Sequence, residues 1–222
     1  MLRHLVAIFT AFAFAGLAAQ ASAKPVEFFQ VDGVTYDEQV PAFETMAGYE
    51  IGERPVRYAD MVAYLKDLAA RSDRISVETI GYSHERRPIL SFTVTSPENH
   101  TNIEAIRQTH LARLKGNAAP DAAPMVLWIN WGVHGSEPSS MDGAIPLLYH
   151  FAAGQSPQIE AQLNNAVMIF TVTFNPDGHA RRIDHVETFW SYGENTDLNA
   201  AAHKLWTEAR VNRYWFDLNR QW

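Results

Sequence analysis

The sequence has no cysteine among its 222 residues. This absence excludes a disulfide framework, a thiolate metal site and a cysteine nucleophile. Basic residues are also scarce: 18 Lys and Arg stand against 25 Asp and Glu, which gives a formal net charge of −7, and they form no cluster. Nucleic-acid binding depends on a basic surface, so the sequence predicts no nucleic-acid partner.

Long apolar runs are equally rare, and the clearest one lies at the N-terminus. A short basic start, residues 1–4, precedes an apolar stretch, residues 5–19, and the small-x-small site Ala21-Ser22-Ala23. The stretch is shorter than the ~20 residues that span a bilayer, so cleavage is favoured over a membrane anchor. Residues 1–23 are therefore predicted to be a signal peptide, and the mature chain to be secreted or periplasmic with no membrane partner.

The rest of the composition, with 47% apolar and 19% charged residues, is typical of a folded globular protein. Residues 24–57 carry several Pro, Gly and acidic positions without a long periodicity. They are predicted to form an irregular segment with one short strand near residues 28–31. The regular patterns begin at residue 58, and residues 58–222 contain no domain boundary that the sequence indicates.

Helix and strand patterns alternate along these residues. Helical periodicity covers residues 58–71, 102–115, 139–153 and 157–164, and strand patterns cover residues 75–80, 89–95, 126–131 and 166–174. This order predicts an α/β fold with a central mixed, largely parallel β-sheet flanked by helices. The last two strands lack a polar face, so we expect the sheet to be buried on both sides.

The strand at 126–131 ends in a turn that carries His134 and Glu137. An imidazole and a carboxylate three residues apart are donors of the kind that zinc accepts, and loops at strand ends often hold chemistry. A His-x-x-Glu pair also occurs by chance, and its histidine could simply cap the following helix. The position at the carboxyl edge of a predicted sheet favours a ligand site.

A second candidate segment, residues 209–222, places Arg210, Arg213 and Arg220 among aromatic residues, with Asn219 beside the last arginine. Guanidinium groups present a planar fork suited to carboxylates and developing oxyanions, and an amide adds a neutral donor. The same composition also fits a solvated surface segment decorated by cation–π contacts.

Four features together resemble the zinc carboxypeptidases of the carboxypeptidase A type, in the order of that family. The first is Gly81–Pro88, which is similar to the family's Gly-x-Ser-x-Glu-Gly-Arg-Pro turn, and the second is the His134–Glu137 pair. The others are Asn175-Pro176-Asp177-Gly178 and the segment Arg210-x-Asn212 followed by Asp217-Leu218-Asn219-Arg220. Ala209 and Arg86 stand where the family pattern has glycine.

The resemblance implies a metallocarboxypeptidase that hydrolyses C-terminal peptide bonds of peptides or proteins. It implies that His134 and Glu137 bind one zinc ion and that Arg210 polarises the scissile carbonyl. Asn219 and Arg220 fall where the family holds the C-terminal carboxylate of the substrate. These roles agree with the chemistry of the side chains, since the scissile carbonyl develops negative charge and the substrate ends in a free carboxylate.

The family's third zinc ligand, pocket tyrosine and glutamate general base follow the Asn-Arg pair, beyond Trp222. His150, His179, His185 and His203 all precede that pair, and Glu187, Glu194 and Glu208 match no family position. Residues 58–222 are therefore interpreted as the N-terminal portion of a catalytic domain, truncated at the C-terminus and inactive alone. A sheet cut short leaves an unpaired edge, so we expect the fragment to aggregate or to be molten.

Two other functions remain open. One is a zinc-dependent N-acyl amino acid deacylase of the same superfold, which shares the His-x-x-Glu and Asn-Arg logic. The other is a non-catalytic exported module that binds peptide carboxylates without turnover. The sequence does not indicate an oligomeric state or a side-chain preference.

Overall fold

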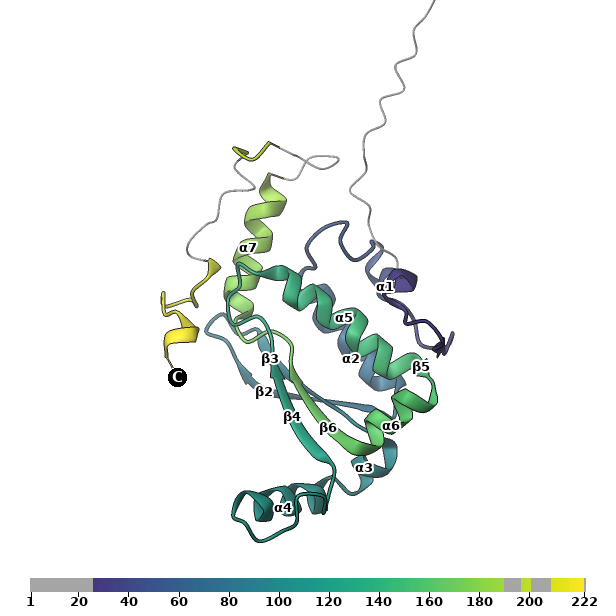
Figure 1. The fold of residues 1–222 in the computed structure, drawn as a ribbon. Coiled ribbons are helices and arrows are strands. Elements are labelled where there is room, and N and C mark those ends of the chain that lie inside the picture. Colours follow the sequence, from purple (N-terminus) through teal and green to yellow (C-terminus); the bar gives the residue numbers. More distant parts are fainter. Residues whose placement is uncertain (1–25, 190–196, 201–208, 222) are drawn as a thin grey trace, which may run out of the picture.

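The computed structural model describes residues 26–189, 197–200 and 209–221 (Figure 1). Its main sheet has the strand order β2 (Ile75–Tyr82), β3 (Pro88–Val94), β6 (Ala166–Thr171), β4 (Met125–Asn130). The β4–β6 pair is parallel, and the β2–β3 and β3–β6 pairs are antiparallel. The α/β class and the mixed sheet are confirmed, but the sheet is less parallel than predicted because β3 runs against its two neighbours.

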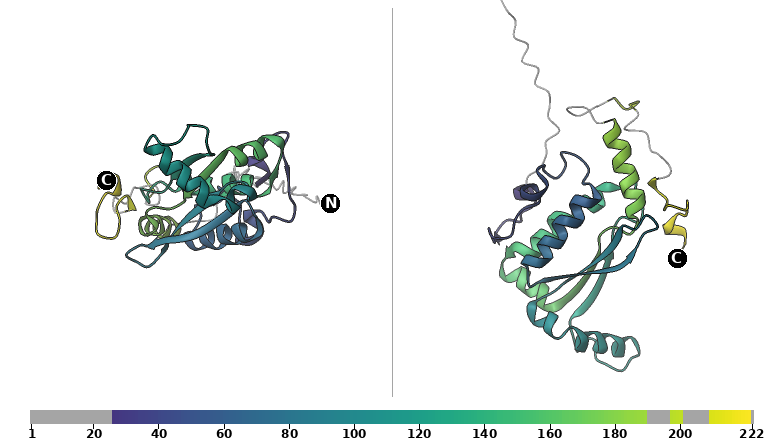
Figure 2. Two further views of the ribbon diagram at one scale, coloured as in Figure 1. Left: turned by 90° about the horizontal axis from the view of Figure 1, so that it is seen from below. Right: turned by 180° about the vertical axis from the view of Figure 1, so that it is seen from behind.

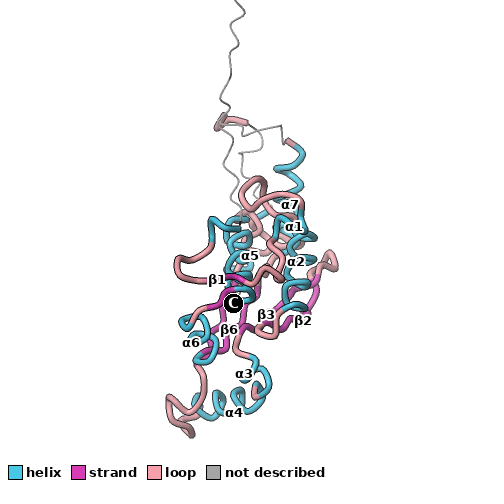
Figure 3. The backbone as a smooth tube through the Cα atoms, turned by 90° about the vertical axis from the view of Figure 1, so that its right-hand side faces the viewer, coloured by secondary structure: helices cyan, strands magenta, loops and turns pink. Residues whose placement is uncertain are grey.

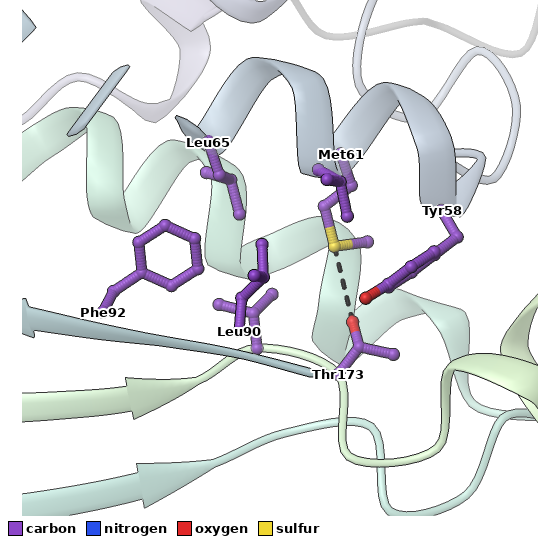
Figure 4. Close-up of a pocket in the computed structure, with 8 residues that line it drawn as sticks. Tyr58, Met61, Leu65, Leu90, Phe92 and Thr173 are labelled. Atoms are coloured by element: carbon purple, nitrogen blue, oxygen red, sulfur yellow. Dashed lines mark hydrogen bonds between the residues drawn. The ribbon is translucent and has the colours of Figure 1, made fainter. Parts of the chain in front are cut away.

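Helices α2 (Tyr58–Arg71) and α5 (Pro138–Ala153) pack against each other and run along the sheet (Figure 2, right). Their apolar stripes are fully buried: Met61, Leu65 and Leu68 come from α2, and Met141, Ile145 and Leu148 from α5. Burying a large apolar side chain contributes about 1.5–3 kcal/mol, so these stripes are a main source of fold stability. Between α2 and the sheet lies a small, almost wholly apolar cavity, lined by Tyr58, Met61, Val62, Leu65, Leu90, Phe92, Val172 and Thr173 (Figure 4).

The central strands are buried, but the edge strand β4 is not. On β4, Met125 is 54% exposed and Trp128 is 60% exposed. The expectation that both apolar strands are covered on two sides is therefore correct for β6 and wrong for β4. Among the described residues, β4 pairs only with β6, so nothing there covers its second edge.

Helix α4 (Ile103–Leu114) forms where an amphipathic helix is predicted, after the short α3 (Pro97–Thr101). Of its apolar set only Ile106 is buried, and Leu114 is 72% exposed. The helix lies at the end of the molecule opposite α7 (Pro176–Thr188) and away from the helical core (Figures 1 and 3). Like β4, it carries apolar side chains that the described residues leave in water.

The N-terminal segment joins the same core. It contains η1 (Val26–Phe29), β1 (Thr35–Tyr36) and α1 (Phe43–Ala47), and β1 pairs with β5 (Gly154–Gln155) just before α6 (Pro157–Asn165). The short strand is therefore at residues 35–36 and not near 28–31. The Tyr36 hydroxyl lies 2.7 Å from His150 Nδ1, which fastens this segment to the end of α5.

Val56 connects the N-terminal segment to two helices, α5 and α7. Its N–H donates to Asp142 Oδ1 of α5 at 3.2 Å, and its carbonyl accepts from His179 Nε2 of α7 at 2.9 Å. Burial lowers the pKa of His179 to about 4, which keeps the imidazole neutral in the core. Burial also raises the pKa of Asp142 to about 7.

The predicted signal peptide, residues 1–23, lies outside the described residues. Among the helices that the structure describes, none has the length and apolar character needed to cross a membrane.

Asp142→Asn should stabilise the fold at neutral and alkaline pH. The pKa of Asp142 rises from 3.8 to about 7 on folding, so its favourable effect is complete below pH 3.8 and is lost as the pH rises towards 7. An asparagine can still accept from the Val56 N–H without a buried charge. Chemical denaturation at pH 8 should show a gain of about 1–4 kcal/mol over wild type, at ~1.4 kcal/mol per pKa unit. The gain should shrink towards pH 4, and a gain independent of pH would contradict this account.

The exposed β4 edge should make the chain self-associate. An uncharged edge strand pairs readily with other strands, and a lysine on it opposes such pairing. Met125→Lys should therefore shift the chain towards monomer in size-exclusion chromatography with light scattering. Leu114→Lys adds the same charge on exposed α4 and is the control. A monomeric wild type with a sharp cooperative melt would refute the prediction.

Candidate metal centre and carboxylate site

The turn after β4 is built so that His134 and Glu137 approach each other. Gly132 has φ 64°, the left-handed region, and a Cβ there would lie 2.6 Å from Met141 Sδ. The Glu137 N–H donates to the His134 carbonyl at 3.2 Å, and α5 starts at Pro138, where a missing N–H costs nothing. The turn therefore delivers both side chains directly before a rigid helix.

The turn rests on the start of α7. A Cβ on Gly135 would overlap the Gly178 carbonyl carbon and the His179 nitrogen, so only glycine permits this approach. Asn175 caps α7 by accepting from the Gly178 N–H at 3.0 Å. Its N–H donates to the Gly132 carbonyl at 2.8 Å, and its Nδ2 donates to the Arg210 carbonyl at 3.3 Å. Asn175 thus connects the turn at residues 132–137, α7 and the C-terminal segment.

Asp177 connects the turn at residues 81–88 to the Asn-Pro-Asp-Gly turn at residues 175–178. Its side chain is 3% exposed and accepts from Ser83 Oγ at 2.6 Å, from Arg87 Nη1 at 2.8 Å and from the Glu85 N–H at 3.2 Å. A buried carboxylate needs such partners, so the two turns stabilise each other. Arg86 has φ 64° in this turn, at the position where the family pattern has glycine.

The centre of the site is a four-residue contact. His134 is 8% exposed, and its Nδ1 lies 3.2 Å from Glu137 Oε1 and 3.3 Å from Arg210 Nη1. On the other side of the ring, His134 Nε2 lies 3.2 Å from Asp217 Oδ1. Asp217 Oδ2 accepts from Arg210 Nε at 2.9 Å, which closes the group. Burial would raise the pKa of Asp217, but hydrogen bonds from the Asn219 N–H, Arg210 and His134 outweigh it and lower the pKa.

Asp217 places a proton on one nitrogen of His134. An ionised carboxylate can only accept, so Nε2 carries a proton and donates to Asp217. The other nitrogen, Nδ1, faces both a donor, Arg210 Nη1, and an acceptor, Glu137 Oε1. A carboxylate that holds Nε2 in this way leaves Nδ1 as the nitrogen that could bind a metal.

His134 Nδ1 and Glu137 Oε1 lie 3.2 Å apart, and the Arg210 guanidinium beside them supplies a positive charge. Two ligands of one tetrahedral zinc with bonds of 2.0–2.1 Å stand about 3.3 Å apart, so identity and spacing both fit zinc. Among the described residues, however, no group of three or more His, Cys, Asp or Glu side chains could hold a metal. This part of the chain therefore offers two candidate ligands, His134 and Glu137.

Asn219 and Arg220 lie in η4 (Leu218–Arg220), immediately after Asp217. Both are exposed, and Arg220 Nη1 donates to the Asn219 carbonyl at 3.0 Å. The structure therefore brings His134, Glu137 and Arg210 together and leaves the Asn-Arg pair in solvent beside them. Asp217, which the sequence offers only as part of the Asp-Leu-Asn-Arg segment, is the residue that joins the two halves of the site.

The other histidines have different surroundings. His179 is fully buried against Val56, and His150 contacts Tyr36. The ring of His185 packs against Phe189, the residue that follows α7. His203 lies outside the described residues, as do Glu194 and Glu208. Glu187 forms ion pairs with Arg57 at 2.9 Å and Arg54 at 3.7 Å.

Comparison with known proteins identifies the family of this chain. The family model for zinc carboxypeptidases matches residues 61–222, so the chain belongs to the zinc carboxypeptidase family. No curated protein sequence matches it.

Solved structures with a similar fold include a metallo-carboxypeptidase from Burkholderia cenocepacia, at 17% identity over 76% of this chain and 33% of that one, with a TM-score of 0.49. Another is the carboxypeptidase A from Helicoverpa armigera, at 17% identity over 73% and 36% with a TM-score of 0.42. The chain thus spans about a third of the length of these proteins.

Asp217→Asn tests the hydrogen bond from His134 Nε2 to Asp217. In wild type, ¹⁵N-detected NMR of the histidine side chains should show a protonated Nε2 on His134. An asparagine amide can donate as well as accept, so the variant should show Nε2 without its proton in part of the population. Asp121→Asn, on an exposed loop, is the control. A wild-type spectrum with an unprotonated Nε2 would refute the assignment.

Proposed function

We propose that this chain carries the metal-binding turn and the carboxylate-recognition residues of a zinc metallocarboxypeptidase exported by its N-terminal signal peptide. One observation supports this most: His134 Nδ1 and the Glu137 carboxylate converge beside a guanidinium. Such a pair of side chains suits a cation, and the adjacent arginine suits an oxyanion. The substrate would be a peptide or protein C-terminus.

The residues would act as follows. His134 and Glu137 would bind one zinc ion, which supplies Lewis acidity and lowers the pKa of bound water when present. Arg210, whose Nε is fixed by Asp217, keeps its Nη1 next to His134 and can face a carbonyl oxygen that gains charge. Asn219 and Arg220 are free to take a substrate carboxylate, for which an arginine fork and an amide are well matched.

With two protein ligands, the site should bind zinc weakly, since a catalytic zinc has three protein ligands and one water. We propose that a third ligand and the general base are needed for hydrolysis and that this chain alone does not turn over substrate. A carboxylate-binding module without catalysis is a second candidate. It is favoured by the exposure of Asn219 and Arg220, together with the finding that the described residues offer two candidate zinc ligands.

Arg220→Ala tests the carboxylate role. Fluorescence anisotropy would compare one labelled hexapeptide with a free C-terminus and its C-terminal amide. Wild type should prefer the free acid by about 10- to 100-fold, which corresponds to a charge-assisted hydrogen-bond pair of ~1.5–3 kcal/mol. Arg220→Ala should abolish the preference. Arg71→Ala removes an exposed arginine of α2 and should leave it intact.

Zinc titration, with and without His134→Ala, separates the two candidates. Weak binding that disappears in the variant would favour the hydrolase site. Carboxylate preference in wild type with no zinc binding at all would favour the binding module. An equal affinity for acid and amide in wild type would overturn both.

A further inference from the structure

The C-terminal segment exposes three consecutive aromatic side chains that the proposed zinc and carboxylate roles leave unused. Tyr214 is 60% exposed, Trp215 64% and Phe216 53%. We call residues 212–216 the aromatic loop. Soluble proteins seldom leave large apolar side chains in a contiguous exposed group unless that group makes an interaction.

The aromatic loop is held in one shape by Asn212. The Asn212 side-chain oxygen accepts from the N–H groups of Tyr214 and Phe216 at 2.9 and 3.1 Å. The backbone of Asn212 also exchanges two hydrogen bonds, donating to the Phe216 carbonyl at 3.0 Å and accepting from the Trp215 N–H at 3.2 Å. The rings are therefore presented by a closed loop and not by a loose strand.

Trp215 occupies this loop at a conformational cost. Its φ is 69°, in the left-handed region that glycine adopts freely and that a bulky aromatic residue rarely enters. Neither backbone conformation nor burial explains a tryptophan here, because glycine suits the φ angle better and the ring is in solvent. Strained residues of this kind concentrate at sites that bind ligands.

The loop lies next to the proposed carboxylate site. One residue, Asp217, links it to the centre of the site, and Asn219 and Arg220 follow after Leu218. Arg213 Nη1 lies 3.3 Å from Glu85 Oε1, and the ring of Tyr214 packs on His84 with 4.3 Å between centroids. These contacts set the loop on the turn between β2 and β3, where the two segments lie side by side (Figure 1).

We propose that the aromatic loop is a docking platform for the residues that precede the C-terminus of a polypeptide substrate and that it selects apolar and aromatic side chains there. The inference rests on the proposed carboxylate role of Asn219 and Arg220, since it places the loop beside a chain end already held by them. Tyr and Trp suit such a platform, because they offer large rigid contact area with few rotatable bonds.

Trp215→Gly is the sharpest test, because the proposal predicts opposite effects on thermal stability and on peptide affinity. The substitution removes the ring and relieves the positive φ. The thermal midpoint should therefore stay equal or rise, whereas affinity should fall about fivefold or more for a free-acid hexapeptide with Phe and Leu before its last residue. Affinity for a hexapeptide with Ala at those positions should be nearly unchanged. Trp128→Ala, which removes a similarly exposed ring on β4, should alter neither affinity.

The outcomes separate this inference from the proposed function. If the free acid is preferred over the amide but wild type binds the Phe-Leu and Ala peptides equally, the carboxylate role stands and the platform is refuted. A Trp215→Gly variant that loses thermal stability would also refute it, since the ring would then serve the fold. If the acid preference is absent while Trp215→Gly still weakens the Phe-Leu peptide, the carboxylate role fails. The loop would then bind apolar side chains without reference to a C-terminus, which refutes the platform as proposed.

Discussion

The carboxylate of Asp217 is the constraint on which the candidate site depends. It accepts from His134 on one oxygen and from Arg210 on the other, and it joins segments that are 83 residues apart in the sequence. This one group holds Nε2 of the histidine and sets the direction of the guanidinium. Without it the C-terminal segment would still be bound to Asn175 through the Arg210 carbonyl, but His134 and Arg210 would no longer be held together.

Support for that contact comes from backbone packing as much as from charge. Gly135 lets the turn at residues 132–137 contact the start of α7. Gly178 lets the start of α7 contact the C-terminal segment, because a Cβ there would lie 2.6 Å from the Ala209 carbonyl oxygen. Asp177 holds the β2–β3 turn against the same helix start. The aromatic loop then rests on that turn through Arg213 and Tyr214. The four sequence motifs of the family thus meet around one place in the fold, the start of α7.

Most helices and strands follow from local periodicity, but their exposure does not. The pattern of β4 is that of a buried strand, yet Trp128 is in water, because burial depends on partners that no local pattern specifies. The same holds for Leu114 on α4. At the site, His134, Glu137 and Arg210 were identifiable by residue type and order. Asp217 was not, since a carboxylate in a loop acquires its role only when folding brings a distant imidazole and guanidinium to it.

Arg210 also bears on how a metal would bind. Its Nη1 lies 3.3 Å from the same nitrogen that would ligate zinc, and its positive charge lies beside both that nitrogen and Glu137. The guanidinium cannot withdraw freely, because Asp217 holds its other nitrogen at 2.9 Å. A zinc ion would therefore bind next to an existing positive charge, and part of its electrostatic gain at Glu137 is already present without it. With two candidate ligands among the described residues, such a site would need a third donor to gain further metal affinity.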